Sequence, residues 1–259
     1  MLSKNIILRG ISNFFRTIWA IWATIGFFLS GLVTVIAFFF IFKFSSEEKA
    51  YYRGWKMSRW WVSMILLFPL VRYRTIGKEK IDKNQNYVFV SNHLSMMDIP
   101  VSLLASPVPT SFLAKVEVDK VPLIGYITRR GHVYVDRKSA TSRYKSFMNM
   151  KEHLEKNRSI HIYVEGTRNT TDQPLKEFHD GAFKVAIMTQ KPIAVLTLKY
   201  AHAIVGKGFK VRPGKITAVW AEPISTIGMT DADIPALKEK VRNIMLDNLA
   251  AMNMKYQLT

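Results

Sequence analysis

Two groups of polar residues could do chemistry, and each follows an apolar run typical of a buried strand. The first group contains His93 and Asp98, in the segment SNHLSMMD after YVFV at 87–90. A histidine held by a carboxylate through Nδ1 leaves Nε2 free to take a proton from a hydroxyl group. Because the two residues are five apart, one continuous helix would separate them by about 140°. We therefore expect His93 in the turn before a helix and Asp98 at its start, where Pro100 is tolerated.

The second group is EGTR, from Glu165 to Arg168, after IHIYV at 160–164. Gly166 would let the backbone approach a ligand closely. Arg168 could hold a phosphate through two parallel hydrogen bonds. Each group also has a structural alternative when it is taken alone. Asp98 could cap a helix that follows a loop histidine, and Glu165 could form a solvated pair with Arg168 in a surface turn.

The stretch between these groups contains further basic and turn-forming residues, but its pattern alone is unspecific. Lys and Arg there could bind phosphate, and Gly and Pro could shape turns. The other histidines show no metal-ligand spacing, so we expect no metal site. The chain has no cysteine, which excludes disulfides, thiolate chemistry and zinc sites with Cys ligands. No nucleophile elbow, phosphate loop or dinucleotide-binding glycine motif occurs. The residues that stand out are Lys115, Pro122, Gly125, Arg130, Gly131 and Arg137.

From about residue 73 onward, short β-branched runs alternate with segments of helical periodicity. This alternation predicts an α/β fold with a mixed, mainly parallel sheet flanked by helices. Sites in such sheets lie beyond the carboxyl ends of strands, where both polar groups occur. Thr230 and Asp233 form a capping box that predicts the start of a final helix. We expect strands at 87–90, 132–135, 160–164, 193–200 and 215–222, and helices at 99–105, from near 139 to 154, at 181–190 and from 230 to about 252.

The N-terminal part of the chain is apolar enough to interact with a membrane. Residues 18–42 carry no charged side chain, and about 20 apolar residues can cross a bilayer as a helix. A second apolar patch at 60–71 is too short to span, and would be interfacial, re-entrant or a buried core helix. Basic residues flank the first segment on both sides, so a hairpin within one leaflet, a true span, and packing of both segments on the α/β domain all stay open. We predict a membrane-associated helical hairpin or anchor at 1–72 and an α/β domain at 73–259.

The formal net charge of +18 implies an anionic partner. Nucleic acid and an anionic bilayer surface both qualify, but the sequence contains no recognisable nucleic-acid-binding module. The basic residues also lie beside the apolar segments, and an anionic leaflet attracts each nearby Lys or Arg by about 1 kcal/mol. We therefore expect a membrane-lipid partner and no nucleic acid.

Taken together, the motifs resemble those of the glycerolipid acyltransferase family, most closely the bacterial 1-acylglycerol-3-phosphate acyltransferases. The resemblance covers residues 73–225, with the blocks in the family's order and spacing. One four-letter motif is weak evidence, whereas four ordered blocks are specific. An apolar N-terminal segment also occurs in the family. The matching residues are Asn92, His93 and Asp98 in the first block; Lys115, Glu117, Pro122, Gly125 and Arg137 in the second; Glu165 to Arg168 in the third; and Lys191, Pro192 and Ile193 in the fourth, with Phe178, Gly181, Ala182 and Phe183 in a turn before it.

The resemblance implies a direct acyl transfer without an acyl-enzyme. His93 would act as general base on the free sn-2 hydroxyl of lysophosphatidic acid, and Asp98 would orient its imidazole. The alkoxide would attack the thioester of acyl-CoA or acyl-carrier protein, which is a co-substrate, so no cofactor is expected. The product would be phosphatidic acid, an intermediate of phospholipid biosynthesis. The implied substrate-binding residues are Lys115, Glu165, Gly166, Thr167 and Arg168, with Asn92 and Arg137 as further candidates.

Several alternatives stay open beside this function. Asn169 follows the third block where many family members carry Ser, so the acceptor could be another lysolipid, such as a lyso-aminolipid. The same His–Asp pair could also run transacylation or lipid hydrolysis. A basic, membrane-docked binding protein with a degenerate site would need no catalysis at all. The resemblance to bacterial enzymes implies a location at the cell inner membrane, with the active site on the cytoplasmic side.

Overall fold

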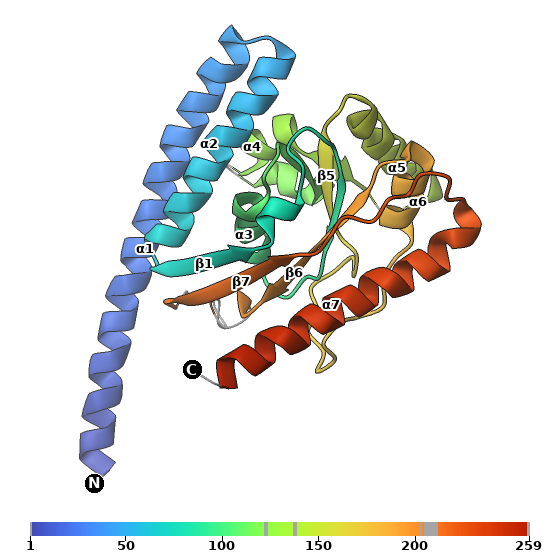
Figure 1. The fold of residues 1–259 in the computed structure, drawn as a ribbon. Coiled ribbons are helices and arrows are strands. Elements are labelled where there is room, and N and C mark those ends of the chain that lie inside the picture. The colour runs from blue at the N-terminus through green and yellow to red at the C-terminus, as the bar shows by residue number, and fades with distance from the viewer. Residues whose placement is uncertain (1, 122–123, 137–138, 202–203, 205–211, 258–259) are drawn as a thin grey trace.

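The computed structural model describes residues 2–121, 124–136, 139–201, 204 and 212–257. It begins with a long helix, α1 (Leu2–Phe44), which packs antiparallel against α2 (Glu47–Leu67) (Figure 1). Within α1, Thr17–Phe44 is a stretch of 28 residues with a mean hydropathy of 2.5, long and apolar enough to cross a membrane. The expected apolar N-terminal helix is therefore confirmed, and its placement in a bilayer stays a prediction.

The second apolar patch belongs to a longer helix and is not a separate segment. Small residues recur every four positions along α2 and give it one face that packs closely. At Gly54 on this face, a Cβ atom would make an ordinary van der Waals contact with the ring of Phe42 on α1, at 3.6 Å. The patch then ends in a turn, and Val71, which we expected to be its last residue, begins the first strand.

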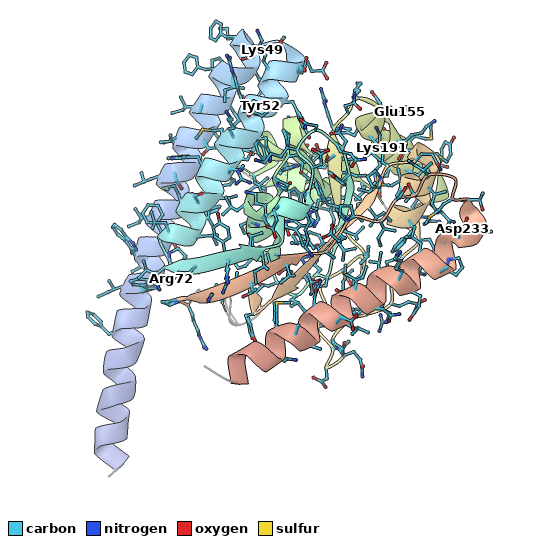
Figure 2. The ribbon with its side chains drawn as sticks, viewed as in Figure 1. Lys49, Tyr52, Arg72, Glu155, Lys191 and Asp233 are labelled. Carbon is cyan, nitrogen blue, oxygen red and sulfur yellow. The ribbon has the colours of Figure 1, made fainter. Side chains whose placement is uncertain are left out.

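The hairpin of α1 and α2 packs against the rest of the chain mainly through α2. Lys49 and Tyr52 lie near its turn, away from the sheet (Figure 2). Further along α2, the Arg59 guanidinium donates hydrogen bonds to the carbonyl oxygens of Leu103 and Ser106, at 2.6 and 2.9 Å. These bonds satisfy carbonyl groups at the end of α3 (Asp98–Ala105), which a helix end otherwise leaves without partners.

Seven strands form one sheet in the order β1-β7-β6-β2-β5-β3-β4. Neighbouring strands are parallel except β6 and β7, so β1 and β7 run against the other five. The predicted α/β fold with a mixed, mainly parallel sheet flanked by helices is confirmed. The strands are β1 (Val71–Ile76), β2 (Val88–Ser91), β3 (Thr110–Lys115), β4 (Val133–Val135), β5 (Ser159–Tyr163), β6 (Ile193–Lys199) and β7 (Gly214–Trp220).

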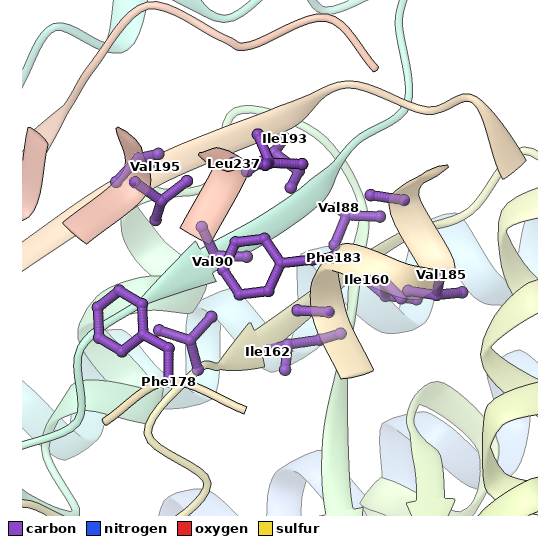
Figure 3. Packing of buried hydrophobic residues seen from close by; sticks show 14 of the residues in the cluster. Val88, Val90, Ile160, Ile162, Phe178, Phe183, Val185, Ile193, Val195 and Leu237 are labelled. Carbon is purple, nitrogen blue, oxygen red and sulfur yellow. The ribbon is translucent and has the colours of Figure 1, made fainter. Parts of the chain in front are cut away.

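Both faces of the sheet are covered by helices. Strand β2 shows why, because Val88 and Val90 enter the core on one face while Phe89 enters the core on the other. The first core lies under α5, α6 and α7 and includes Phe183 (Figure 3). The second core lies under α2 and α3, and α4 packs against the hairpin. The remaining helices are α4 (Ile124–Gly131), α5 (Ala140–Glu155), α6 (Gly181–Thr189) and α7 (Ile234–Gln257).

Three elements were not predicted from the sequence: β1, β3 and α4. Strand β3 has the sequence TSFLAK, which lacks the β-branched run that marked the other central strands. Helix α4 contains Gly125 and Gly131 and was interpreted as a set of turns. The capping box of Thr230 and Asp233 is confirmed, although a short 3-10 turn precedes α7. The division into 1–72 and 73–259 stays a prediction.

Replacing Phe183 by Ala should lower the free energy of unfolding by about 3–5 kcal/mol, because the fully buried ring would leave a cavity between α6 and the sheet. Denaturant unfolding of the detergent-purified protein measures this loss. Met188 on the same helix is 53% exposed, and Met188→Ala should change stability by less than about 0.5 kcal/mol. Equal losses in the two variants would contradict the packing.

Candidate active site

The two polar groups meet because their strands are neighbours. β2 and β5 pair in parallel with Ser91 opposite Tyr163, so the segments that follow them leave the sheet at the same edge. The carboxyl ends of β6 and β3 flank this pair at the same edge. The predicted position of both groups, beyond the carboxyl ends of parallel strands, is therefore confirmed.

His93 and Asp98 lie on either side of a strand-to-helix junction. His93 lies between β2 and α3, and Asp98 is the first residue of α3. Nδ1 of His93 is 2.7 Å from Oδ2 of Asp98, so the geometry required by their spacing is confirmed. Nε2 has no hydrogen-bond partner among the residues that the structure describes, and the imidazole keeps 15% of its surface exposed.

The carboxylate of Asp98 holds the loop as well as the imidazole. Its Oδ2 also accepts the backbone N–H groups of Leu94 at 2.6 Å and Ser95 at 2.7 Å. The helix-capping alternative is wrong, because Met97 occupies the cap position and the Asp98 side chain bonds back to the preceding turn. With these donors around one oxygen, Asp98 acts as the acceptor toward His93. Nδ1 of His93 is therefore the donor in this contact, and in the neutral imidazole Nε2 would be the acceptor.

Glu165 holds the backbone of the His93 loop. Its Oε1 accepts the N–H of His93 and its Oε2 accepts the N–H of Lys176, both at 2.8 Å. The side chain is only 1% exposed, and this burial raises the pKa of Glu165, while the two N–H donors act in the opposite direction. The solvated pair of Glu165 with Arg168 is therefore wrong. With both oxygens occupied by backbone groups, the structure favours a positioning role for Glu165 over direct contact with a phosphate.

Two asparagines make further hydrogen bonds that hold the loop of His93. The buried amide of Asn92 both donates to and accepts from the backbone of Leu198 on β6, at 2.9 and 2.8 Å. The N–H of Asn169 donates to the carbonyl oxygen of His93 at 2.6 Å. The Asn169 side chain bonds within its own loop, to Thr171 and Gln173. Both backbone polar groups of His93 are thus held by the segment that contains EGTR.

Two aromatic rings of β5 form a stack with the His93 imidazole, and the sequence analysis did not predict this stack. The Tyr163 ring lies 4.2 Å from the His93 ring at an interplanar angle of 20°, and its hydroxyl is 3.3 Å from Oγ of Ser102. His161, two residues earlier on β5, lies 5.2 Å from Tyr163, and its Nε2 is 2.7 Å from Oγ of Ser91. Alternate residues of a strand point to the same face, which is the signal that could have revealed the stack.

The cationic candidates around this centre are exposed. Arg168 follows EGT, and Lys115 ends β3 at the same sheet edge; among the described residues neither has an ion-pair partner. Oγ1 of Thr167 accepts a hydrogen bond from Nζ of Lys176 at 2.9 Å, which adds a cation that the sequence analysis missed. Gly166 has φ of +68°, a conformation that other residues rarely adopt. Arg137 and Pro122 lie outside the described residues.

A cavity of about 620 Å³ begins beside these residues, within the range of about 300–1,000 Å³ typical of ligand pockets. Tyr163 and Gly166, at the end of β5, are among its lining residues. Its apolar lining includes Ile162, Phe147 and Met150, and charged side chains such as Arg143 and Lys184 also line it. The site therefore combines a paired histidine and exposed cations with a partly apolar cavity nearby. No group of three potential ligands that could hold a metal occurs in the described part of the chain.

Acidification should destabilise the fold through His161. Burial, with a smaller contribution from the charge of His93, lowers the pKa of His161 from 6.5 to about 3. The folded protein thus keeps this imidazole neutral, while the unfolded chain binds a proton below about pH 6.5. Stability from this group is fully present above that pH and falls by about 1.4 kcal/mol per pH unit toward pH 3. His161→Phe should flatten the dependence of the melting temperature on pH between 6.5 and 4, and an unchanged slope would contradict this assignment.

The chain is similar to several known proteins. The family model described as Acyltransferase matches residues 72–199. A 1-acyl-sn-glycerol-3-phosphate acyltransferase of Limnanthes alba is 33% identical over 63% of this chain and 59% of its own length. A lyso-ornithine lipid O-acyltransferase of Pseudomonas aeruginosa is 24% identical over 76% of this chain and 80% of its own length. The chain thus spans about three fifths of the length of the plant relative.

A solved structure shares the fold. The crystal structure of the 1-acyl-sn-glycerophosphate acyltransferase from Thermotoga maritima has a TM-score of 0.77, at 22% sequence identity, and the match covers 92% of this chain and 98% of that one. The matched family domain contains both polar groups, from His93 to Arg168. Residues 72–199 of the chain therefore form a domain that matches the acyltransferase family, as the resemblance of its motifs implied.

Proposed function

We propose that this protein transfers a fatty acyl group from acyl-CoA or acyl-carrier protein to the sn-2 hydroxyl of lysophosphatidic acid, giving phosphatidic acid. The observation that carries the proposal is the 2.7 Å contact of His93 Nδ1 with Asp98 Oδ2, which leaves Nε2 as a proton acceptor at the strand edge. The names of the curated relatives support the choice of reaction and acceptor.

The reaction needs one proton acceptor and no covalent acyl-enzyme. Nε2 of His93 takes the proton of the acceptor hydroxyl as its oxygen attacks the thioester carbonyl carbon. The carboxylate of Asp98 stabilises the imidazolium that forms. The carbon–sulfur bond then breaks, and the leaving thiolate takes the proton back from His93. Each substrate atom is accounted for, so the proposed reaction requires no cofactor.

The acceptor phosphate is proposed to bind Arg168, with Lys115 and the Lys176–Thr167 pair nearby. Arg168 is exposed at the end of EGTR, and its planar guanidinium can contact two phosphate oxygens at once. Glu165 does not belong to this set, because both of its oxygens bond the backbone. Its role in the proposal is to hold His93.

The acyl chain of the donor is proposed to enter the 620 Å³ cavity. Tyr163 and Gly166, at the end of β5, are among the residues that line this cavity, which continues between β5 and α5 along Ile162, Phe147 and Met150. In the proposal, the thioester lies at this strand end and the acyl chain lies along the apolar side chains. A thioester carried by CoA or by a carrier protein fits this description equally well.

Association with the cytoplasmic face of an inner membrane is part of the proposal. The apolar stretch Thr17–Phe44 and the net charge of +18 support an anionic bilayer as the source of the acceptor.

A lyso-aminolipid is the second candidate acceptor, and the relative from Pseudomonas aeruginosa favours it. The presence of Asn169, where many family members carry Ser, does not favour this acceptor. Among the described residues, the Asn169 side chain bonds only within its own loop. Turnover of a panel of lysolipids, with acyl-CoA and with acyl-carrier protein, separates these acceptors and donors. Release of CoA without a new ester would instead indicate hydrolysis.

Replacing His93 by Ala should lower kcat by about 10²–10⁴-fold, because general-base catalysis is lost. Release of CoA in the presence of lysophosphatidic acid and acyl-CoA measures the change. His153→Ala removes an imidazole on α5, outside the site, and should keep turnover within about twofold of the wild type. A loss of only about tenfold for His93→Ala, with the fold intact, would count against the assigned role.

Replacing Arg168 by Ala should raise KM for lysophosphatidic acid by about 10- to 100-fold, since a hydrogen bond to a charged group contributes about 1.5–3 kcal/mol. KM for monoacylglycerol, which lacks the phosphate, should stay unchanged. Arg168→Lys should be intermediate, because Lys lacks the two-pronged geometry. Equal effects on both acceptors would remove Arg168 from the phosphate site.

A further inference from the structure

A second cavity lies on the other side of the sheet from the donor cavity. Its volume is about 430 Å³, and it lies between α1 and the C-terminal end of α2. The donor cavity borders the core under α5 and α6, whereas Met97 in this second cavity belongs to the core under α2 and α3. The lining that matters is Ala23, Phe27 and Phe28 of α1, Ile65 and Pro69 of the α2 end, and Met97.

This lining offers a ligand no charge and no free hydrogen-bonding group. Its one hydroxyl, on Thr24, donates to the carbonyl oxygen of Ala20 in the same helix at 2.7 Å. A headgroup would lose its hydration here without compensation, whereas a hydrocarbon chain would gain from leaving water. The chemistry of the cavity therefore selects an aliphatic chain.

Close contacts between α1 and the end of α2 form one side of this cavity. At Gly26, between its α1 lining residues, a Cβ atom would lie 2.3 Å from the ring of Phe68, so α1 and the end of α2 touch there. Trp22 also packs edge-on against Phe68, with ring centroids 5.6 Å apart. The cavity is thus a groove beside a close helix contact.

The groove touches the segment between His93 and α3 at one residue, Met97. Met97 lines the groove and directly precedes Asp98, whose carboxylate holds His93. Its neighbours Met96 and Ile99 are 47% and 45% exposed, which is high for large apolar side chains beside a site. Along α1, Ile21 and Ile25 are likewise exposed. The groove therefore lies between α1 of the candidate membrane stretch and the residue that precedes Asp98.

We propose that this groove holds the fatty acyl chain of the lysolipid acceptor while its glycerol hydroxyl lies at His93. The proposal rests on the acyl transfer described above, which brings together two substrates that each carry a fatty chain. The donor chain occupies the cavity under α5 and α6, and the acceptor chain occupies the groove under α1 and α2. The acceptor then moves sideways from the bilayer to the imidazole without its chain crossing water.

Filling the groove tests this assignment. Ala23→Trp should raise KM for oleoyl-lysophosphatidic acid by about tenfold or more, since exposing even two methylene groups costs about that factor. Hexanoyl-lysophosphatidic acid, whose chain is too short to need the groove, should keep its KM. Val33→Trp adds the same ring on the exposed face of α1, and should change neither KM. Equal effects of Ala23→Trp on both acceptors, or none on either, would overturn the proposal.

A photoreactive lysophosphatidic acid gives a second readout that needs no turnover. With a diazirine in its acyl chain, it should label α1 and the end of α2 in the full-length protein bound to anionic vesicles. Ala23→Trp should abolish this labelling, and Val33→Trp should not. Labelling of α5 and α6 instead would overturn the groove. Absence of turnover in the wild type with every acceptor would count against the acyl transfer, and leaves the labelling as the test of the groove.

Discussion

The buried carboxylate of Glu165 is the interaction on which the candidate site depends. It joins the loop after β2 to the loop after β5, through the N–H groups of His93 and Lys176. A buried carboxylate without partners would be costly, so the two loops cannot separate without leaving that charge or two amides unsatisfied. The constraint is therefore reciprocal, because the loops keep the carboxylate bonded and the carboxylate keeps His93 at the sheet edge.

Residues from several different elements contact His93, and these contacts restrict rotation and tilting of its imidazole ring. Asp98 on α3 fixes Nδ1, Tyr163 at the end of β5 lies beneath the ring, and the Asn169 N–H holds the carbonyl of His93. Rotation of the ring would break the Nδ1 contact, and tilting would break the stack. These contacts hold Nε2 in one orientation. A fixed orientation of the reacting atom favours proton transfer.

Sequence reasoning could predict the position of the site but not all of its internal bonding. Strand-ending motifs placed His93 and Arg168 at the same edge, and the five-residue spacing fixed which side of the helix start each partner occupies. Glu165 was assigned to the substrate because a pattern of residue types does not tell whether a carboxylate faces a ligand or a backbone amide. Tyr163 was missed because an aromatic residue in a buried strand is ordinary, and its role depends on which strand lies beside it. Strand β3 was missed because its position between β5 and β4, more than its composition, makes it a strand.

The position of the helical hairpin follows from the chemistry that the site is proposed to perform. The sheet has an apolar core on each face, and the proposal assigns one substrate chain to each side. The cavity under α5 and α6 lies on the face away from the hairpin, so a donor that arrives in water can use it. The groove under α1 and α2 lies beside the apolar stretch Thr17–Phe44, so an acceptor that stays in the bilayer can use that one. If both chains approached from one face, they would compete for the same apolar volume. In the proposal, separating the chains across the sheet avoids this competition, and the hairpin would take part in presenting the acceptor as well as in membrane association.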